Sequence, residues 1–232
     1  MQLGNIARED KKMMNIAIDG PAGAGKSTIA KRVAKQLGFI YVDTGAMFRA
    51  MGLYFLRNQF DMEQKSLLEE ESKKIDIALK FENGEQQVLL NGENVNGYIR
   101  VEEVGKIASI IATNPAIRTR LLELQQKIAR ENHVVMDGRD IGTCVLPNAQ
   151  VKIYLTASSK ERARRRYEEL IAKGEQCDIA IIEEDIIQRD YADMNREIAP
   201  LRQAKDAVLI DSSDMTIEEV VHAILNEYEQ KK

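Results

Sequence analysis

The segment GPAGAGKS at residues 20–27 fits the pattern G-x-x-x-x-G-K-[ST] and directly follows a short apolar run at residues 15–18. In this pattern, glycines let backbone amides close around an anion, the lysine reaches the phosphates, and the hydroxyl is placed for Mg²⁺. Residues 26–37 carry apolar side chains at helical spacing, and Gly38 after them is a typical helix stop. The order of strand, phosphate-binding loop and helix favours a parallel sheet and predicts that the chain binds a nucleoside triphosphate.

The loop and the first turn of the helix form the expected donor-binding set. Lys26 is expected to hold the β- and γ-phosphates, and Ser27 is expected to coordinate Mg²⁺. An ordinary glycine turn between a strand and a helix is the alternative. The residues of the set are Gly20, Pro21, Ala22, Gly23, Ala24, Gly25, Lys26, Ser27 and Thr28.

Strand-like and helical segments alternate along most of the chain. Apolar runs at residues 39–42, 133–136, 151–156 and 207–210 are typical of strands, and a helical segment follows each of them. This alternation predicts an α/β fold with a parallel sheet flanked by helices on both faces. Because ligands bind beyond the carboxyl ends of the strands in such sheets, residues directly after a strand are the candidates for function.

Residues 61–100 interrupt this alternation. The runs at 75–81 and 88–90 are strand-like, and two Asn-Gly pairs, at 83–84 and 91–92, are typical of tight hairpin turns. We therefore expect a small antiparallel insertion within the parallel fold.

The composition excludes several classes of protein. With 232 residues, 44% of them hydrophobic, the chain can bury one core plus a small unit, and it has no apolar run long enough to cross a bilayer. Residues 1–13 lack an apolar signal region, so we expect a flexible leader and no export. The two cysteines and two histidines are too dispersed for a zinc site, and we expect reduced thiols in the cytoplasm. A net charge of −4 argues against general nucleic-acid binding.

The apolar run at 134–136 ends in a carboxylate, Asp137. This is the form expected of the acidic element that orders Mg²⁺ or its waters beside a phosphate-binding loop. Arg139 and Asp140 follow and place a cation and another carboxylate over the expected substrate crevice. The alternative is a surface turn.

Helix-capping groups follow the second strand at Asp43 and Thr44, and Arg49 lies a little over one turn into the next helix. A free helix N-terminus and a guanidinium could therefore share one anion. An N-cap beside a solvated arginine is the alternative.

Arg162, Arg165 and Arg166 fall at i, i+3 and i+4 and so share one side of a helix. Because like charges at this spacing repel, we expect an anion there, and closure over a triphosphate is the favoured interpretation. A solvated basic face and a nucleic-acid patch are the alternatives.

Arg189, Asp193 and Arg196 lie at i, i+4 and i+7, on one helical face ahead of Pro200. They form either a surface ion-pair ladder or a clamp for a ribose and a base. The spacing does not separate the two.

Four segments resemble motifs of the bacterial cytidylate kinases and occur in that family's order: GPAGAGKS at 20–27, DTGAMFRA at 43–50, MDGRDIGT at 136–143 and RDYADMNREIAPL at 189–201. The resemblance covers the chain from about residue 14 to the last helix and is to the long form of these P-loop nucleoside monophosphate kinases. It implies a P-loop core, an acceptor-binding insertion with a three-stranded antiparallel sheet, and a helical lid. The expected boundaries are 1–13 for the leader, 14–60, 101–157 and 189–232 for the core, 61–100 for the insertion and 158–188 for the lid.

The resemblance also implies a role for individual positions. Arg49 and Arg139 match arginines that grip the 5′-phosphate of the acceptor, with Thr44 beside them. Ser109, Arg118 and Arg196 match the residues that read cytosine. Arg189 and Asp193 match the pair near the sugar hydroxyls. The remaining expectations are a position close to the acceptor for Asp140, a catalytic role for Lys26, Arg139, Asp140, Arg165 and Arg166, donor contact for Arg162, and Mg²⁺ binding by Ser27 and Asp137. Cys144 departs from the family, which more often has an apolar residue there.

The implied reaction is transfer of the γ-phosphoryl group of Mg²⁺·ATP to CMP or dCMP by a monomer that has no nucleic-acid or membrane partner. One alternative keeps the phosphate-binding loop and changes the acceptor to UMP or a small metabolite, as in shikimate-type kinases. Another is a nucleotide-driven switch or a nucleic-acid motor. The acidic balance of the chain and the absence of a basic, aromatic-rich channel argue against a motor.

Overall fold

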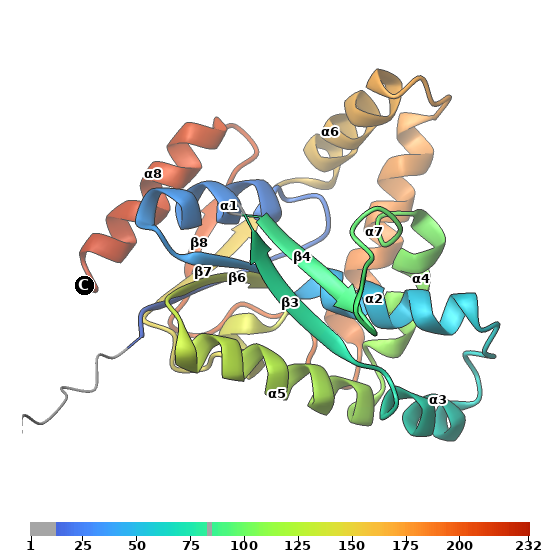
Figure 1. Cartoon of the computed structure of the whole chain (residues 1–232). Coiled ribbons are helices and arrows are strands. Elements are labelled where there is room, and N and C mark those ends of the chain that lie inside the picture. Colours follow the sequence, from blue (N-terminus) through green and yellow to red (C-terminus); the bar gives the residue numbers. More distant parts are fainter. Residues whose placement is uncertain (1–12, 83–84) are drawn as a thin grey trace, which may run out of the picture.

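The computed structural model describes residues 13–82 and 85–232 (Figure 1). The leader expected at 1–13, apart from Met13, and the turn expected at 83–84 lie outside the described residues. The elements in chain order are β1 (Asn15–Asp19), α1 (Lys26–Leu37), β2 (Ile40–Asp43), α2 (Thr44–Arg57), α3 (Lys65–Ser72), β3 (Ile77–Glu82), β4 (Glu85–Leu90), β5 (Glu93–Asn94), α4 (Glu102–Ile111), α5 (Pro115–Glu131), β6 (Val134–Gly138), a π-helical turn η1 (Ile141–Val145), β7 (Val151–Thr156), α6 (Ser159–Ala172), α7 (Ile179–Asn195), β8 (Val208–Asp211) and α8 (Ile217–Glu229).

The core is a five-stranded sheet in the order β2-β6-β1-β7-β8, and every neighbouring pair is parallel. The predicted α/β fold is therefore confirmed. Strand β1 lies in the centre, so the phosphate-binding loop at its carboxyl end opens in the middle of the sheet edge. Within the described ranges, no helix is long and apolar enough to cross a bilayer.

Alternating side chains of the central strands divide the core into two layers. Ile16 and Ile18 point to the layer formed with α1 and α8, whereas Ala17 belongs to the layer formed with α2 and α5. Figure 1 shows α1 and α8 on one side of the sheet and α5 on the other. Because both faces are covered, the strands can be apolar throughout, as parallel strands usually are.

The insertion is a second sheet of β3, β4 and β5, and it is antiparallel as predicted. Asn91 and Gly92 have φ of 50° and 85°, the two left-handed residues that a tight hairpin turn needs. Gln86 on β4 ties this sheet to the core, because its Oε1 accepts the backbone N–H of Asp43 at 2.8 Å.

Helices α6 and α7 project beyond the carboxyl ends of the strands, over the phosphate-binding loop (Figure 1). They pack against each other as a helical pair. The boundary expected at residue 188 falls inside α7, which is continuous from Ile179 to Asn195.

Gly20 directly follows β1, at a point where its backbone passes close to that of β7. A Cβ on Gly20 would lie 1.9 Å from the carbonyl oxygen of Leu155, and the residue has φ of 153°. No side chain fits without moving the β7 backbone. The first glycine of the loop is therefore required by packing, before any ligand is considered.

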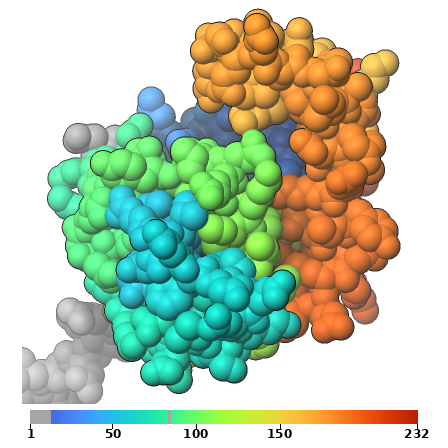
Figure 2. Space-filling view, turned by 90° about the vertical axis from the view of Figure 1, so that its right-hand side faces the viewer, coloured from blue at the N-terminus to red at the C-terminus, as the bar shows by residue number. Residues whose placement is uncertain are grey.

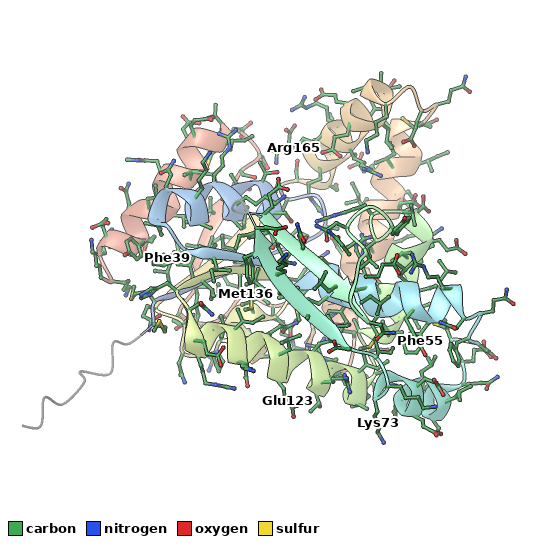
Figure 3. The ribbon with its side chains drawn as sticks, viewed as in Figure 1. Phe39, Phe55, Lys73, Glu123, Met136 and Arg165 are labelled. Atoms are coloured by element: carbon green, nitrogen blue, oxygen red, sulfur yellow. The ribbon has the colours of Figure 1, made fainter. Side chains whose placement is uncertain are left out.

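Phe55 provides a test of the larger core layer. Its side chain on α2 is fully buried (Figure 3). Its ring meets those of Tyr54 and Phe60 edge-on. We expect Phe55→Ala to lower the free energy of unfolding by about 3–5 kcal/mol, because the cavity cannot collapse fully. Phe81→Ala, at an exposed position on β3, is the control and should cost less than about 1 kcal/mol in the same urea titration. Equal losses would contradict this assignment of the core.

Candidate active site

A cleft of about 270 Å³ opens at the carboxyl ends of β1, β2 and β6. Figure 2 shows it as a hollow between the orange α6–α7 segment and the green α4 segment, with blue atoms of the N-terminal part at its base. Fourteen residues expected at the site from the sequence line this cleft: Ala22, Gly23, Lys26, Ser27, Thr44, Arg49, Ser109, Arg118, Asp137, Arg139, Asp140, Arg189, Asp193 and Arg196. The segments at the ends of β1, β2 and β6 therefore meet as predicted from the strand ends. Side chains of α4, α5 and α7, which were expected from helical spacing or from the resemblance, join them.

The cleft is strongly cationic although the chain as a whole is acidic. Seven cationic and four anionic side chains line it, an excess of three positive charges in a chain with a net charge of −4. Such a concentration of positive charge draws anionic ligands out of solution. It also favours ligands with several negative charges over neutral metabolites.

The phosphate-binding loop presents backbone amides rather than side chains. Gly25 is the N-cap of α1, has φ of 83° and provides no side-chain cap, so amides at the start of α1 remain free for an anion. Lys26 is 6% exposed, and its Nζ donates to the carbonyl of Pro21 at 2.6 Å. Burial, followed by the nearby Arg139, lowers the pKa of Lys26 to about 7. A phosphate in the loop would restore the charged form.

Ser27 and Asp137 meet at the base of the cleft. Ser27 Oγ donates to Asp137 Oδ2 at 3.0 Å, and the carboxylate is 4% exposed. Burial, followed by the charge of Asp43, raises the pKa of Asp137 to about 6. Asp137 Oδ1 and the hydroxyl of Tyr41 are buried without a hydrogen-bond partner among the described residues.

These residues fit Mg²⁺. The ion prefers oxygen ligands and usually retains several waters while it binds one or two protein groups and substrate phosphates. The hydroxyl of Ser27 and the unsatisfied oxygen of Asp137 are donors of that kind, and a hydrated ion would supply the partner that Asp137 Oδ1 lacks.

Helix α2 carries the residues expected to hold an acceptor phosphate. Its N-cap is Asp43, which accepts the N–H of Ala46 at 2.9 Å. Thr44 Oγ1 donates to the carbonyl of Asp137 at 2.8 Å, which joins this helix to β6. The guanidinium of Arg49 donates to the carbonyl of Ile99 at 3.1 Å, and burial, followed by repulsion from Arg189, lowers its pKa.

Asp140 brings together two arginines from distant helices. Arg118 on α5 and Arg196 at the end of α7 both form ion pairs with its carboxylate, and all three side chains are largely buried. Arg118 also lies over the ring of Phe48, with its guanidinium carbon 5.8 Å from the ring centre. This side of the cleft has the donors, the acceptor and the flat surface that a planar polar base requires.

A second polar cluster lies across the cleft from Asp140 and is built around Arg189 and Asp193 of α7. Arg139 Nε donates to Asp193 at 2.7 Å, and Arg189 donates to the hydroxyl of Ser109 at 3.1 Å. Burial is the largest single effect on Asp193 and opposes its ionisation. The charge and hydrogen bond of Arg139, together with the charges of Arg189 and Arg196, outweigh burial and lower the pKa of the carboxyl. Arg189 and Asp193 thus point into the cleft and are not part of a solvated surface ladder.

The three arginines of α6 that were expected in a lid, Arg162, Arg165 and Arg166, lie outside the lining of the cleft. Arg162 is 5% exposed and joins the helical pair to the phosphate-binding loop, because it donates to Ala22 O at 2.9 Å and to Asp190 at 2.6 Å. Arg165 donates to Ser212 O at 2.7 Å and lies on α6 above the loop (Figure 3).

Arg166 is half-exposed and pairs with Glu169 at 3.3 Å. The repulsion that the sequence predicted among these arginines is relieved by carboxylates on α6 and α7. Two of the three arginines approach the loop glycines. Arg162 Cβ lies 3.4 Å from the place of a Cβ on Gly23, and Arg165 brings its Nη1 to 4.0 Å from the place of a Cβ on Gly25.

The sequence analysis missed two charged residues, one that holds the turn η1 beside the cleft and one that lines the cleft. Asp19, the last residue of β1, accepts the backbone N–H groups of Ile141 and Gly142. It directly follows the apolar run at residues 15–18, and this position was the signal that could have found it. Arg100 lines the cleft and pairs with Asp43 at 2.7 Å. Its position depends on how the insertion folds back, and no local pattern indicates that.

The comparisons with known proteins agree with this geometry. Residues 16–230 match a family model described as cytidylate kinase. The chain is 51% identical over 221 residues to a cytidylate kinase of Listeria innocua, covering 95% of this chain and 98% of that protein. It is 50% identical over 214 residues to one of Caldicellulosiruptor bescii, covering 92% and 95%. A cytidylate kinase of Ligilactobacillus salivarius is 47% identical over 220 residues, covering 95% and 98%. The chain belongs to the cytidylate kinase family of nucleoside monophosphate kinases.

Proposed function

We propose that this chain transfers the γ-phosphoryl group of Mg²⁺·ATP to the 5′-phosphate of CMP or dCMP, giving the diphosphate and ADP. The observation that carries the proposal is the cationic cleft, in which a phosphate-binding loop faces arginines from α2, α5, α7 and the loop after β6. Family membership supports the same reaction. Two polyanionic nucleotides could meet in such a cleft because the arginines offset their repulsion.

On the donor side, Lys26 and the loop amides would hold the β- and γ-phosphates. Ser27 and Asp137 would bind Mg²⁺, which neutralises charge on the phosphates when bound. Arg165 would reach the transferring group from the lid, whereas the buried contacts of Arg162 suit it to holding the lid against the loop.

On the acceptor side, Arg49, Arg139 and Arg100 would surround the 5′-phosphate, with Thr44 beside it. Ser109, Arg118 and Arg196 would read the base, and Arg189 with Asp193 would bind the sugar. The ion pairs that these groups form with one another would exchange for contacts to the nucleotide, so little side-chain order need be gained on binding.

The reaction requires positioning more than a strong base. A phosphate monoester has a second pKa near 6 and is largely a dianion at neutral pH. The residues of the cleft would align the attacking oxygen with the γ-phosphorus and stabilise the charge that develops on the equatorial oxygens. Closure of α6 and α7 would exclude water and so limit hydrolysis of ATP.

We also propose a cytoplasmic monomer. Both cysteines, Cys144 and Cys177, are free thiols, as expected in a reducing compartment.

The proposal is tested by a coupled assay of ADP release with Mg²⁺·ATP against CMP, dCMP, UMP, AMP and GMP. We expect turnover with CMP and dCMP alone. Equal activity with UMP would keep a kinase and overturn the selection of cytosine. Hydrolysis of ATP that no acceptor stimulates would indicate a switch or a motor instead.

The base-reading residues provide one prediction. We expect Ser109→Ala and Arg118→Met to raise the KM for CMP by about tenfold or more and the KM for ATP by less than about threefold, because buried polar groups of the base lose their partners. Arg130→Met on the exposed end of α5 is the control for loss of charge and should leave both constants unchanged. Parallel changes in the two KM values would count against the assignment.

The lid provides another prediction. Arg165→Ala should lower turnover by about 10²–10³, as loss of a donor to developing charge does. Arg166→Ala should have a smaller effect in the same direction. Arg164→Ala, an exposed arginine of the same helix that pairs with Glu161 and Glu168, is the control. The prediction fails if turnover by the Arg165 variant equals that of the control.

A further inference from the structure

Arg139 and Asp140 form a two-residue bridge between the end of β6 and the π-helical turn η1. Neither lies in a regular element, yet each holds a partner across the cleft. Arg139 pairs with Asp193, and Asp140 pairs with Arg118 and Arg196. The position of this bridge has to be fixed by neighbouring residues, because small displacements of groups that align reactants lower the rate of reaction.

One residue, Asp19, holds both ends of the bridge. In the parallel pairing of β1 with β6, Asp19 lies opposite Gly138, which fixes the residue before the bridge. Its carboxylate oxygens accept the N–H groups of Ile141 and Gly142, each at 2.7 Å, which fixes the two residues after it. These amides begin η1 and have no partner within the turn.

The packing around the bridge leaves it little room to relax. A Cβ on Gly138 would lie 2.6 Å from Ile141 Cδ1 and 2.7 Å from Thr44 Oγ1. A Cβ on Gly142 would lie 3.2 Å from Lys152 Cδ and 3.3 Å from Asp19 Oδ2. A side chain at position 138 would force Ile141 or Thr44 to move, and one at position 142 would displace Lys152 or Asp19 by a few tenths of an ångström.

The Asp19 carboxylate is 3% exposed and forms no ion pair within 4 Å among the described residues. Burying an ionised carboxylate without a cation is costly, and an apolar residue at the end of a central strand would avoid that cost. Two convergent acceptors are what the position needs, because an amide side chain offers one acceptor oxygen and would place its NH₂ group against a second donor.

We infer that Asp19 is a positioning residue for the acceptor. It fastens the loop that carries Arg139 and Asp140 to the strand that carries the phosphate-binding loop. Arg139 and Asp140 are thereby held at a fixed position relative to the phosphate-binding loop. The inference rests on the proposed roles of Arg139 and Asp140.

Asp19→Asn tests this inference, since it keeps the shape and removes one acceptor. We expect kcat/KM for CMP to fall about 10- to 100-fold while the dissociation constant for ATP changes less than about threefold, because the loop glycines stay fixed against β7. Backbone amides of Ile141 and Gly142 should exchange faster with deuterium, a readout independent of turnover. The matched control is Asp206→Asn, which removes an exposed partner of Lys152 beside η1 and should leave all three quantities unchanged.

A folded Asp19 variant with the parent's kinetics, or with equal losses for ATP and CMP, would overturn the inference. If Asp19→Asn does not fold, Gly142→Ala decides the matter, because it keeps the carboxylate and displaces the turn from it. Gly142→Ala should raise the KM for CMP several-fold, because a displacement of the turn by less than about 1 Å already misplaces Arg139 and Asp140. An unchanged KM would overturn the inference. Arg139→Met in the same assays separates the two proposals, since an unchanged KM for CMP there would remove the proposed role of the bridge itself.

Discussion

The structure depends on a surplus of positive charge held inside an acidic chain. Seven cations converge on one cleft, and they would repel one another without the four carboxylates among them. Asp140 and Asp193 separate Arg118, Arg196 and Arg139, so each guanidinium has a fixed place before any ligand arrives. Because the cations outnumber the carboxylates, the cleft keeps a positive charge that attracts anions. Rigidity and affinity for phosphate thus come from the same balance.

The fold supplies the convergence that this balance needs. Parallel strands deliver their carboxyl ends to one edge, so β1, β2 and β6 place Lys26, Thr44 and Asp137 within one cleft. The insertion closes the cleft from one side, where Gln86 binds the backbone of Asp43 and Arg100 binds its side chain. The helical pair α6 and α7 closes it from the other, where Arg162 contacts the phosphate-binding loop. Each flanking unit is attached to the core by polar contacts at the active-site edge.

Much of this was predictable from local patterns. The strand before GPAGAGKS, the acidic residue after the strand at 134–136 and the hairpin turn at 91–92 each follow from short-range chemistry, and the structure has all three elements. What the sequence could not provide was which charges pair between different elements. Helical spacing allows the pairs of Arg165 with Glu161 and of Arg166 with Glu169, which lie within α6. Arg162 instead pairs with Asp190 on α7, and nothing in the local sequence indicates that partner. Partners from a different helix, and the place of Arg100, are decided by tertiary packing that no local spacing encodes.

The central claim is that one cleft holds an adenine nucleotide and a cytosine nucleotide end to end. The most direct test is the affinity of a bisubstrate analogue, adenosine and cytidine joined 5′ to 5′ by a pentaphosphate, compared by calorimetry with the analogue that carries uridine. We expect the cytidine analogue to bind more tightly by about 10²-fold or more, because the wrong base leaves buried polar groups unpaired. Equal affinities, or binding no tighter than that of ATP alone, would contradict it.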